Sequence, residues 1–346
     1  MYEAYREIYE QGESLGRSLK HIRAHEHELK AFFSAKDHDE ILFIACGSSY
    51  WLSLSAAATF EDLTGVRCTA LKSGDIVLGP EPYLKAHPKA LIIAPSRSGT
   101  TDETLRAIRI FKEAHGNRVL AFAEYPDSPI AGEADLVIEI PWANEIGILQ
   151  TRSFANLYLL CVALAALIGD DVALLKELEA YIDSFPGHAR RAEAFAESIV
   201  KEFPACSSLV CLGHGRQYGV VIEAAYISVE MNRFPAFYYG TLEFRHGPIV
   251  ICDPSFLVAI FSWGAGRDHE EKMASEIRAR GAKVLAISDM GDFHNADFRL
   301  GMGQGHRPEV LALFGIMVMQ GFAYHMTLRD GGNPDKPKDL VPWISL

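Results

Sequence analysis

Six consecutive residues, Ser96-Arg97-Ser98-Gly99-Thr100-Thr101, combine hydroxyl groups, a guanidinium and a glycine in one short stretch. The apolar run from Ala90 to Ala94 precedes them and predicts a buried strand, and helically spaced apolar residues follow them at Leu105, Ile108 and Phe111. A turn between a strand and a helix places backbone N–H groups at the positive end of the helix dipole. The hydroxyls and the arginine add donors for an anion. We therefore predict that this loop binds the phosphate of a small metabolite, although an ordinary N-cap formed by Thr101 or Ser98 would explain part of the pattern.

Two glutamates and a histidine form a second group of residues that could do chemistry. Glu223 and Glu230 lie two helical turns apart, so they share one helix face. His246 stands in Arg245-His246-Gly247-Pro248, where glycine and proline end the helical pattern and expose the ring. A carboxylate and an imidazole near one pocket can move protons at neutral pH. Two other interpretations stay open: a solvated helix carboxylate for Glu230, and a capping or core histidine at 246.

Apolar strands that alternate with helices position the loop at 96–101. The run from Ile41 to Ala45 ends in Cys46-Gly47-Ser48-Ser49-Tyr50 and is followed by a helix of small residues. Residues 1 to about 36 and 104–115 are predicted to be helical, and further strand candidates lie at 66–70, 76–77, 119–123 and 136–140. This alternation predicts an α/β fold with a parallel, doubly wound sheet. Ligands bind such sheets at the carboxyl ends of the strands, where both serine-rich loops would lie.

The second half of the chain repeats the order of the first. Buried strands are predicted at 208–212, 256–261 and 284–287, with Gly213-His214-Gly215-Arg216 after the first of them and a helix around 270–280. This copy lacks the run of hydroxyls, so we assign the anion to the first domain. The predicted segments are an N-terminal helical segment at 1–36, a first domain at 37–170, a helical linker at 171–202, a second domain at 203–328 and a C-terminal tail at 329–346.

Composition excludes several classes of protein. The 33 lysines and arginines against 45 acidic residues give a net charge of −12, which disfavours nucleic acid or an anionic membrane as a partner. The six cysteines form no CxxC pair and read as reduced core residues, and the acidic N-terminus is not a signal peptide, so we expect a cytoplasmic protein. The longest apolar run noted, 157–168, is too short to span a bilayer.

Metal and nucleotide cofactors are not expected. His21 and His25 have a spacing that can hold a metal, but they lack the glutamate of a zinc protease and are interpreted as a solvated helix face. The pattern Gly213-x-Gly215 lacks the third glycine and the acidic ribose partner of a dinucleotide site, which leaves NAD binding as a weak alternative.

Four motifs together resemble the sugar isomerase (SIS) family: residues 46–50, residues 96–101, Glu145-Ile146-Gly147 with Gln150-Thr151-Arg152-Ser153-Phe154, and Glu243-Phe244-Arg245-His246-Gly247-Pro248. They are most similar to the isomerase half of glucosamine-6-phosphate synthase and to the fructosamine-6-phosphate deglycases. The resemblance covers nearly the whole chain. It implies two tandem SIS domains, a homodimer with the active site near the subunit interface, and a small-molecule sugar phosphate as ligand.

The resemblance also implies roles for individual residues. The sugar phosphate would be bound by Ser49, Ser96, Arg97, Ser98 and Thr101, and the sugar would be bordered by Ile148 and Gln150. Glu230 would move a proton at C1/C2, with Glu223 as a possible accessory group. His246, which in relatives reaches over from the partner subunit, would assist ring opening or protonate the leaving group.

Two departures from the synthase pattern shape the expected function. The lysine that forms a Schiff base in the synthase tail is matched by Pro342, and a lysine on the synthase helix is matched by Ile227. No stretch of this sequence supplies a glutaminase domain, so synthesis of glucosamine 6-phosphate is not expected. The first expectation is a deglycase that releases hexose 6-phosphate and an amine from a fructosamine-type substrate.

Two other functions remain open at this point. One is an aldose–ketose isomerase or an amino-sugar-phosphate deaminase acting at the same site. The other is a phosphosugar-sensing module without catalysis. Lys336 and Lys338 in the tail would restore Schiff-base chemistry if they reached the site. The residues do not identify the amine or the sugar epimer.

Overall fold

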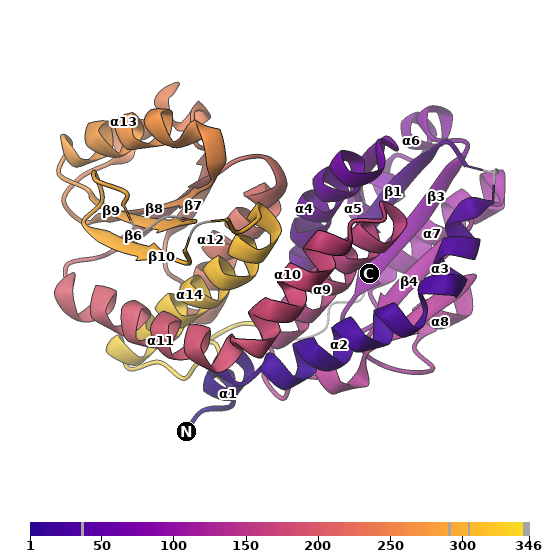
Figure 1. Cartoon of the computed structure of the whole chain (residues 1–346), viewed down its shortest axis with the longest axis horizontal. Coiled ribbons are helices and arrows are strands. Elements are labelled where there is room, and N and C mark those ends of the chain that lie inside the picture. Colours follow the sequence, from indigo (N-terminus) through magenta and orange to yellow (C-terminus); the bar gives the residue numbers. More distant parts are fainter. Residues whose placement is uncertain (36–37, 290–291, 304, 342–346) are drawn as a thin grey trace. The chain divides into compact units, whose positions relative to one another are not determined.

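The computed structural model describes residues 1–35, 38–289, 292–303 and 305–341 (Figure 1). Contacts divide the chain into two compact units of similar size, each built around one sheet. Among the described residues, the sheet-A unit comprises Gln11–Glu145, Arg152–Ile182 and Val341, and the sheet-B unit comprises Met1–Glu10, Ile146–Thr151 and Asp183–Leu340.

Sheet A has five parallel strands in the order β2-β1-β3-β4-β5. The strands are β1 (Glu40–Ala45), β2 (Cys68–Lys72), β3 (Ala90–Ser96), β4 (Val119–Ala123) and β5 (Leu136–Glu139). The central strands β1, β3 and β4 are buried along their whole length, as expected for continuous apolar runs covered on both faces. The chain places β2 on one side of β1 and β3 on the other, so the strand order reverses between β1 and β3.

Helices cover both faces of sheet A. Alternate residues of β1 separate the two faces: Leu42 joins the cluster formed with Ile108 of α7, whereas Phe43 contacts the ring of Phe60 in α4. The helical elements of this unit are α2 (Gly12–Ala24), α3 (Glu26–Ser34), α4 (Gly47–Thr64), α5 (Ser73–Leu78), α6 (Glu81–Ala86), α7 (Asp102–His115), α8 (Pro129–Glu133), η1 (Pro141–Ala143), α9 (Arg152–Ile168) and α10 (Val172–Asp183). The predicted doubly wound α/β architecture is therefore confirmed for this unit.

Sheet B repeats this topology. Its strands are β6 (Ser208–Gly213), β7 (Ala236–Gly240), β8 (Phe256–Ser262), β9 (Lys283–Ser288) and β10 (Phe298–Gly301), and they are parallel in the order β10-β9-β8-β6-β7. Counted from the first strand of each sheet, both sheets have the order 2-1-3-4-5, with the reversal between the first and third strands. The repeat predicted from the sequence is thus present in the strand order.

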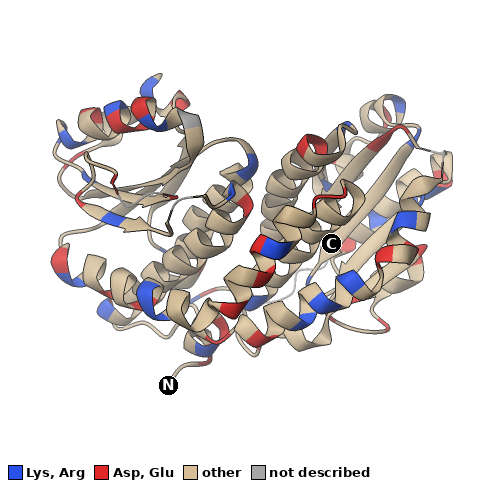
Figure 2. Cartoon of the chain, viewed as in Figure 1, with Lys and Arg blue, Asp and Glu red and all other residues tan. Residues whose placement is uncertain are grey.

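Helices also cover both faces of sheet B. Val210 and Leu212 pack with Ile277 of α13, whereas Gly315 of α14 lies so close to Phe261 that an added Cβ would come within 2.4 Å of its ring. The helical elements are α1 (Glu3–Tyr9), α11 (Phe185–Glu202), η2 (Gly215–Gln217), α12 (Tyr218–Asn232), η3 (Glu243–Arg245), η4 (Pro248–Ile251), η5 (Gly264–Gly266), α13 (Arg267–Arg278) and α14 (Pro308–Arg329). Figure 2 shows charged residues along α13, whereas the strands are mostly without charge.

The structure differs from the expected elements at several places. The predicted strand at Ile76-Val77 is wrong, because these residues lie in α5, where Ile76 is buried against the α7 side of sheet A. Strands β7 and β10 and helix α14 were not predicted. Helix α14 is long and apolar enough to cross a membrane, but 94% of its most apolar window is buried inside the protein, as in a core helix.

The two units also divide the chain at positions other than the expected boundaries. The N-terminal segment is shared: α1 belongs to the sheet-B unit, where the hydroxyl of Tyr5 donates to Glu193 of α11, and α2 and α3 belong to the sheet-A unit. The stretch expected as a helical linker is divided between its two helices, with α10 in the sheet-A unit and α11 in the sheet-B unit. Long-range contacts of this kind leave no local pattern in the sequence.

Candidate functional site

The predicted anion loop is a tight turn between β3 and α7. The hydroxyl oxygen of Ser96 accepts the N–H of Gly99 at 3.0 Å, and that of Ser98 accepts the N–H of Thr100 at 3.2 Å. Gly99 has φ +64°, and a Cβ there would lie 2.3 Å from Oγ of Ser128. The loop therefore requires glycine at this position, both for its backbone conformation and for its packing against the start of α8.

In the part of the chain that the structure describes, helix α7 begins without a side-chain cap from its N-cap residue. Thr101 is the N-cap residue, but within the described residues its side chain makes no capping hydrogen bond. The N-cap interpretation therefore does not account for the Thr101 hydroxyl. In α7, a helix of 14 residues, the first N–H groups lack intrahelical acceptors and carry the positive end of the dipole. The first turn also contains Asp102 and Glu103, so any anion must bind close to the backbone.

Three helix starts of the sheet-A unit meet beside this loop. The Thr104 hydroxyl, in the first turn of α7, lies 3.7 Å from the Sγ of Cys46, the N-cap residue of α4. The same hydroxyl lies 3.1 Å from that of Ser73, the first residue of α5. Ser49, in the first turn of α4, is 5% exposed. Because β1 and β3 are neighbours, the serine-rich loops after both strands lie at the same carboxyl edge, where the strand order reverses.

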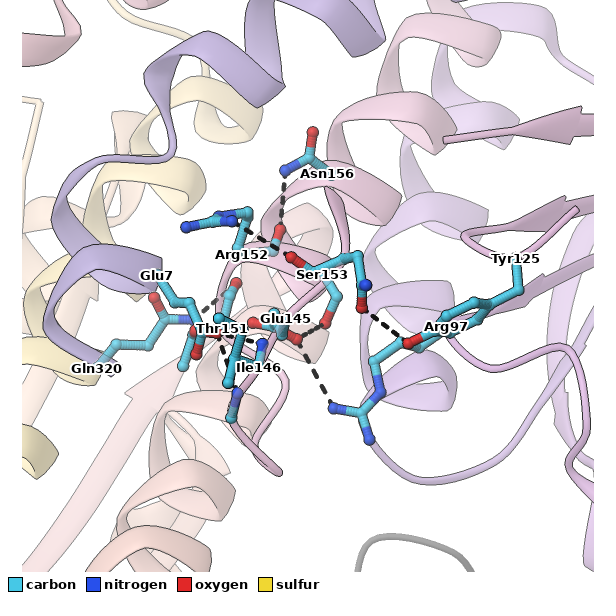
Figure 3. Close-up of polar contacts among 12 residues, drawn as sticks. Glu7, Arg97, Tyr125, Glu145, Ile146, Thr151, Arg152, Ser153, Asn156 and Gln320 are labelled. Atoms are coloured by element: carbon cyan, nitrogen blue, oxygen red, sulfur yellow. Dashed lines mark hydrogen bonds and ion pairs between the residues drawn. The ribbon is translucent and has the colours of Figure 1, made fainter. Parts of the chain in front are cut away.

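Arg97 is held by a buried acid. Its Nη1 lies 3.6 Å from Oε2 of Glu145, whose side chain is 1% exposed (Figure 3). The same carboxylate oxygen accepts a hydrogen bond from the hydroxyl of Ser153 in α9. The structure thus ties the third motif of the resemblance, around Glu145, to the loop at 96–101.

The predicted proton-transfer residues lie in the sheet-B unit. Glu223 is fully buried and Glu230 is half-buried, both on α12, in agreement with the predicted shared helix. Tyr226 lies one turn from each of them, and burial together with the charges of Glu230 and Glu223 raises the pKa of its hydroxyl to about 12. Ile227, at the position of the synthase lysine, is fully buried.

His246 is exposed in a short loop between η3 and η4, as the glycine and proline around it predicted. Phe244 is fully buried and anchors η3, and Arg245 forms an ion pair with Glu276 of α13. Gly247 has φ +124°, a conformation that favours glycine. Exposed apolar side chains flank the loop at Leu242 and Val250, which are 46% and 78% exposed.

Ile148 and Gln150 belong to a third segment, Ile146–Thr151, which contacts assign to the sheet-B unit. The segment contains neither helix nor strand. Leu149 is buried, and Oε1 of Gln150 is buried without a hydrogen-bond partner among the described residues. Glu7 of α1 holds the segment from its beginning, and no sequence motif pointed to that residue.

The predicted site residues are therefore distributed over both units. Ser49, Ser96, Arg97, Ser98 and Thr101 lie together at the carboxyl edge of sheet A, and Ile148, Gln150, Glu223, Glu230 and His246 lie in the sheet-B unit. The tail lysines Lys336 and Lys338 are exposed in the sheet-B unit. Pro342, which matches the position of the synthase tail lysine, lies outside the described residues.

No metal centre emerges from the part of the chain that the structure describes, which contains no group of three or more His, Cys, Asp or Glu placed to hold an ion. The expected solvated face at His21 and His25 needs correction, because the His21 ring packs edge-on against Trp142 at 5.1 Å. Burial lowers the pKa of His21. All six cysteines lie in the described part of the chain and are free thiols, and burial raises the pKa of Cys46 beside the anion loop.

Comparison with known proteins finds a family model that matches part of this chain. Residues 35–168 match the SIS domain. The chain is 28% identical over 362 residues to the isomerizing glutamine–fructose-6-phosphate aminotransferase of Shewanella oneidensis, a match that covers 99% of this chain and 58% of that protein. The chain thus spans less than two thirds of the length of such relatives.

Solved structures share the fold over nearly the whole chain. A glucosamine-6-phosphate deaminase from Thermotoga maritima superposes with a TM-score of 0.78 and 26% identity, covering 95% of this chain and 99% of that one. A tagatose-6-phosphate ketose/aldose isomerase from Escherichia coli superposes with a TM-score of 0.82 and 24% identity, covering 99% and 97%. The second likeness concerns the fold.

Proposed function

Because residues 35–168 form a SIS domain and the chain is homologous to the isomerase half of glutamine–fructose-6-phosphate aminotransferase, we propose that it is a phosphosugar-processing enzyme. We also infer that the sheet-B unit is a second SIS domain, because it repeats the 2-1-3-4-5 strand order of the first. One observation carries the choice of ligand. The loop at 96–101 is preshaped at the reversal point of sheet A, and the Thr101 hydroxyl makes no capping bond there among the described residues. Such a loop suits a phosphate.

Within this class, the proposed reaction is deglycation of a fructosamine-type 6-phosphate. Ile227 is fully buried where the synthase places a lysine, so α12 offers no amine at that position. A fructosamine already carries nitrogen at C1, and its enolisation between C2 and C1 needs a base and an acid but no enzyme amine. Enolisation gives the C1–C2 enaminol, and return of a proton to C2 converts it into the C1 imine. Water then cleaves this imine and releases the amine and hexose 6-phosphate.

Each residue has a defined part in this reaction. The loop at 96–101 and Ser49 grip the phosphate, which orients carbons that are remote from it. Glu230 takes a proton at C1/C2, and such a transfer by a placed side chain contributes about 10²–10⁴-fold to the rate. His246 protonates the leaving group or assists ring opening.

We propose that the active enzyme is a homodimer in which His246 serves the site of the partner subunit. The exposed position of His246 supports this, because a residue that serves its own buried site would not need to face outward. Phe237 and Tyr238 on the edge strand β7 are 40% and 39% exposed, and Leu242 and Val250 beside His246 are also exposed. An unpaired edge strand with apolar side chains is a surface that a second copy would cover.

Amino-sugar-phosphate deamination is the second candidate, favoured by the 26% identity to a protein described as glucosamine-6-phosphate deaminase. Aldose–ketose isomerisation and phosphosugar sensing without turnover remain alternatives. The proposed deglycase assay measures hexose 6-phosphate released from fructoselysine 6-phosphate, coupled to glucose-6-phosphate dehydrogenase. Glucosamine 6-phosphate, and fructose 6-phosphate with ammonia, are run alongside.

Release from the fructosamine, abolished in Glu230→Gln, is the expected result. Turnover of glucosamine 6-phosphate alone would transfer the assignment to the deaminase. Binding without turnover, unchanged in Glu230→Gln, would favour the sensor. The dimer is tested by mixing inactive Glu230→Gln with inactive His246→Ala, since random exchange of subunits restores about a quarter of the wild-type activity when the two residues act across the interface.

A further inference from the structure

The segment Ile146–Thr151 depends on other parts of the chain for its shape. It lies in sequence between two stretches of the sheet-A unit, yet its contacts place it in the sheet-B unit. It contains neither helix nor strand, so its backbone N–H and C=O groups need partners outside regular secondary structure. Two of those partners can be identified.

Glu7 of α1 binds the beginning of this segment. One of its carboxylate oxygens, Oε1, accepts the N–H of Ile146 at 2.6 Å and that of Gly147 at 3.0 Å (Figure 3). Glu7 is 3% exposed, so its carboxylate is buried, and both bonds are partly buried. Hydrogen bonds from backbone N–H groups to an ionised carboxylate are stronger than those between neutral groups.

Gly147 packs closely against the carboxylate of Glu7. A Cβ at position 147 would lie 2.6 Å from the second carboxylate oxygen of Glu7, closer than a Cβ normally approaches another atom. An alanine at 147 would therefore force the end of the Glu7 side chain to shift, so the glycine allows the close approach of the carboxylate. Positions 7 and 147 are matched to each other although they are far apart in sequence.

The other end of the segment and the helix that carries Glu7 are fixed as well. Gln320 of α14 donates from Nε2 to the carbonyl of Thr151 at 3.3 Å. Asp335 accepts the N–H groups of Glu3 and Ala4 at 3.0 and 2.8 Å, which caps the first turn of α1. The segment is thus held at both ends, and its middle residues are those expected to border the sugar.

We propose that Glu7 is a positioning residue that sets the place of Ile148 and Gln150 against the bound sugar. The proposal rests on the proposed function, because it assumes that these two residues border a phosphosugar. Glu7 contacts the segment through the backbone N–H groups of Ile146 and Gly147. Its part is to hold Ile146 and Gly147, and through them the residues that follow.

The test compares Glu7→Ala with Glu7→Gln. Alanine removes the acceptor that two backbone N–H groups share and so loosens the beginning of the segment, and we expect KM for the phosphosugar to rise about 10- to 100-fold with little change in kcat. Glutamine keeps one carbonyl oxygen in place of Oε1 and is expected to restore KM to within about threefold of wild type. Glu10→Ala, an exposed glutamate just after α1, is the control and leaves both constants unchanged.

A double-mutant cycle and amide exchange separate this role from general destabilisation. As a single substitution, Gly147→Ala displaces the Glu7 carboxylate and raises KM. Combined with Glu7→Ala, it raises KM little further, because the carboxylate is already gone. Amide exchange over residues 146–151 accelerates at least about tenfold in Glu7→Ala, whereas the core strands β6 and β8 stay protected.

Different outcomes overturn different statements. An unchanged KM in Glu7→Ala, with a wild-type enzyme that turns over its phosphosugar, overturns the positioning role. Unchanged exchange over 146–151 also overturns it. A wild type that neither binds nor converts any phosphosugar refutes the proposed function and, with it, the sugar-positioning role, while the exchange experiment still decides whether Glu7 holds the segment.

Discussion

Replacing Gly99 by alanine tests whether the anion loop is built around this glycine. Two separate penalties follow from the geometry. With φ +64°, a residue with a Cβ costs about 1–2 kcal/mol relative to the right-handed conformation. The Cβ would also lie 2.3 Å from Oγ and 2.6 Å from Cβ of Ser128, and overpacking of this kind costs about 1–3 kcal/mol. We expect a loss of about 2–5 kcal/mol in the free energy of unfolding.

The matched control is Gly116→Ala at the other end of the same helix. Gly116 has φ +67°, but a Cβ there would meet no atom within 4 Å, so only the conformational penalty applies. The free energies of unfolding of both variants are compared with wild type by urea titration. Phosphate binding is measured by calorimetric titration with fructose 6-phosphate, and Gly99→Ala is expected to lose it while Gly116→Ala retains it.

A second substitution separates the steric penalty of Gly99→Ala from its conformational penalty. Ser128→Gly removes the two nearest atoms that the new Cβ would meet and leaves Cγ2 of Ile130 at 3.0 Å, so it recovers part of the stability of Gly99→Ala. The N–H of Ile130 donates to the carbonyl of Gly99 at 2.9 Å, and this bond between the loop and α8 reforms when the clash is removed. Equal destabilisation by the two glycine variants, or unchanged ligand binding in Gly99→Ala, would refute the reasoning.

Three further predictions concern the sheet-B unit. Burial raises the pKa of Glu270 from 4.5 to about 7, so the folded protein holds a proton that the unfolded chain releases, and stability falls as the pH rises from about 4.5 to 7, by up to about 3 kcal/mol. Unfolding measured across this range should show the slope in wild type and not in Glu270→Gln. Glu309 is fully buried and forms an ion pair with Arg216 at 3.1 Å, so Glu309→Ala should lower the free energy of unfolding by about 3–5 kcal/mol. The double variant with Arg216→Ala should lose less stability, because no unpaired charge is left, and thermal unfolding measures both. Asp335→Ala removes the cap of α1 and should cost about 0.5–2 kcal/mol, with amide exchange accelerated in residues 3–9 and not in α12.

Most of the fold could be predicted from the sequence because parallel strands buried on both faces appear as continuous apolar runs. Strand β4 has the predicted bounds, 119–123, and strands β1 and β3 extend the predicted runs by one or two residues. Strand β7 was missed because it lies at the sheet edge, where its side chains are partly exposed and its pattern is mixed. Helix α14 was missed because it is buried on all sides, which removes the periodicity that reveals a surface helix.

The site residues also include some that the sequence reveals and some that it does not. Loops that follow strands directly were found, because a hydroxyl-rich turn and its glycine are local features. Glu7 and Asp335 were not found, because each acts on backbone groups far away in sequence, and a lone carboxylate on a helix carries no signal of such a role. A single sequence does not show that positions 7 and 147 contact each other, because only folding brings them together.

The two sheets show how one topology can hold different chemistry at its reversal point. In sheet A, the strand after the reversal ends in hydroxyls whose oxygens shape an open turn before α7. In sheet B, the corresponding hydroxyl, Ser262, donates instead to the carboxylate of Glu270, and Nδ1 of His214 lies 3.5 Å from the other oxygen of that carboxylate. A buried carboxyl group at that place repels a phosphate whenever it is ionised. This arrangement gives a physical reason for assigning the anion to the first domain alone, which the sequence suggested only through the missing hydroxyls.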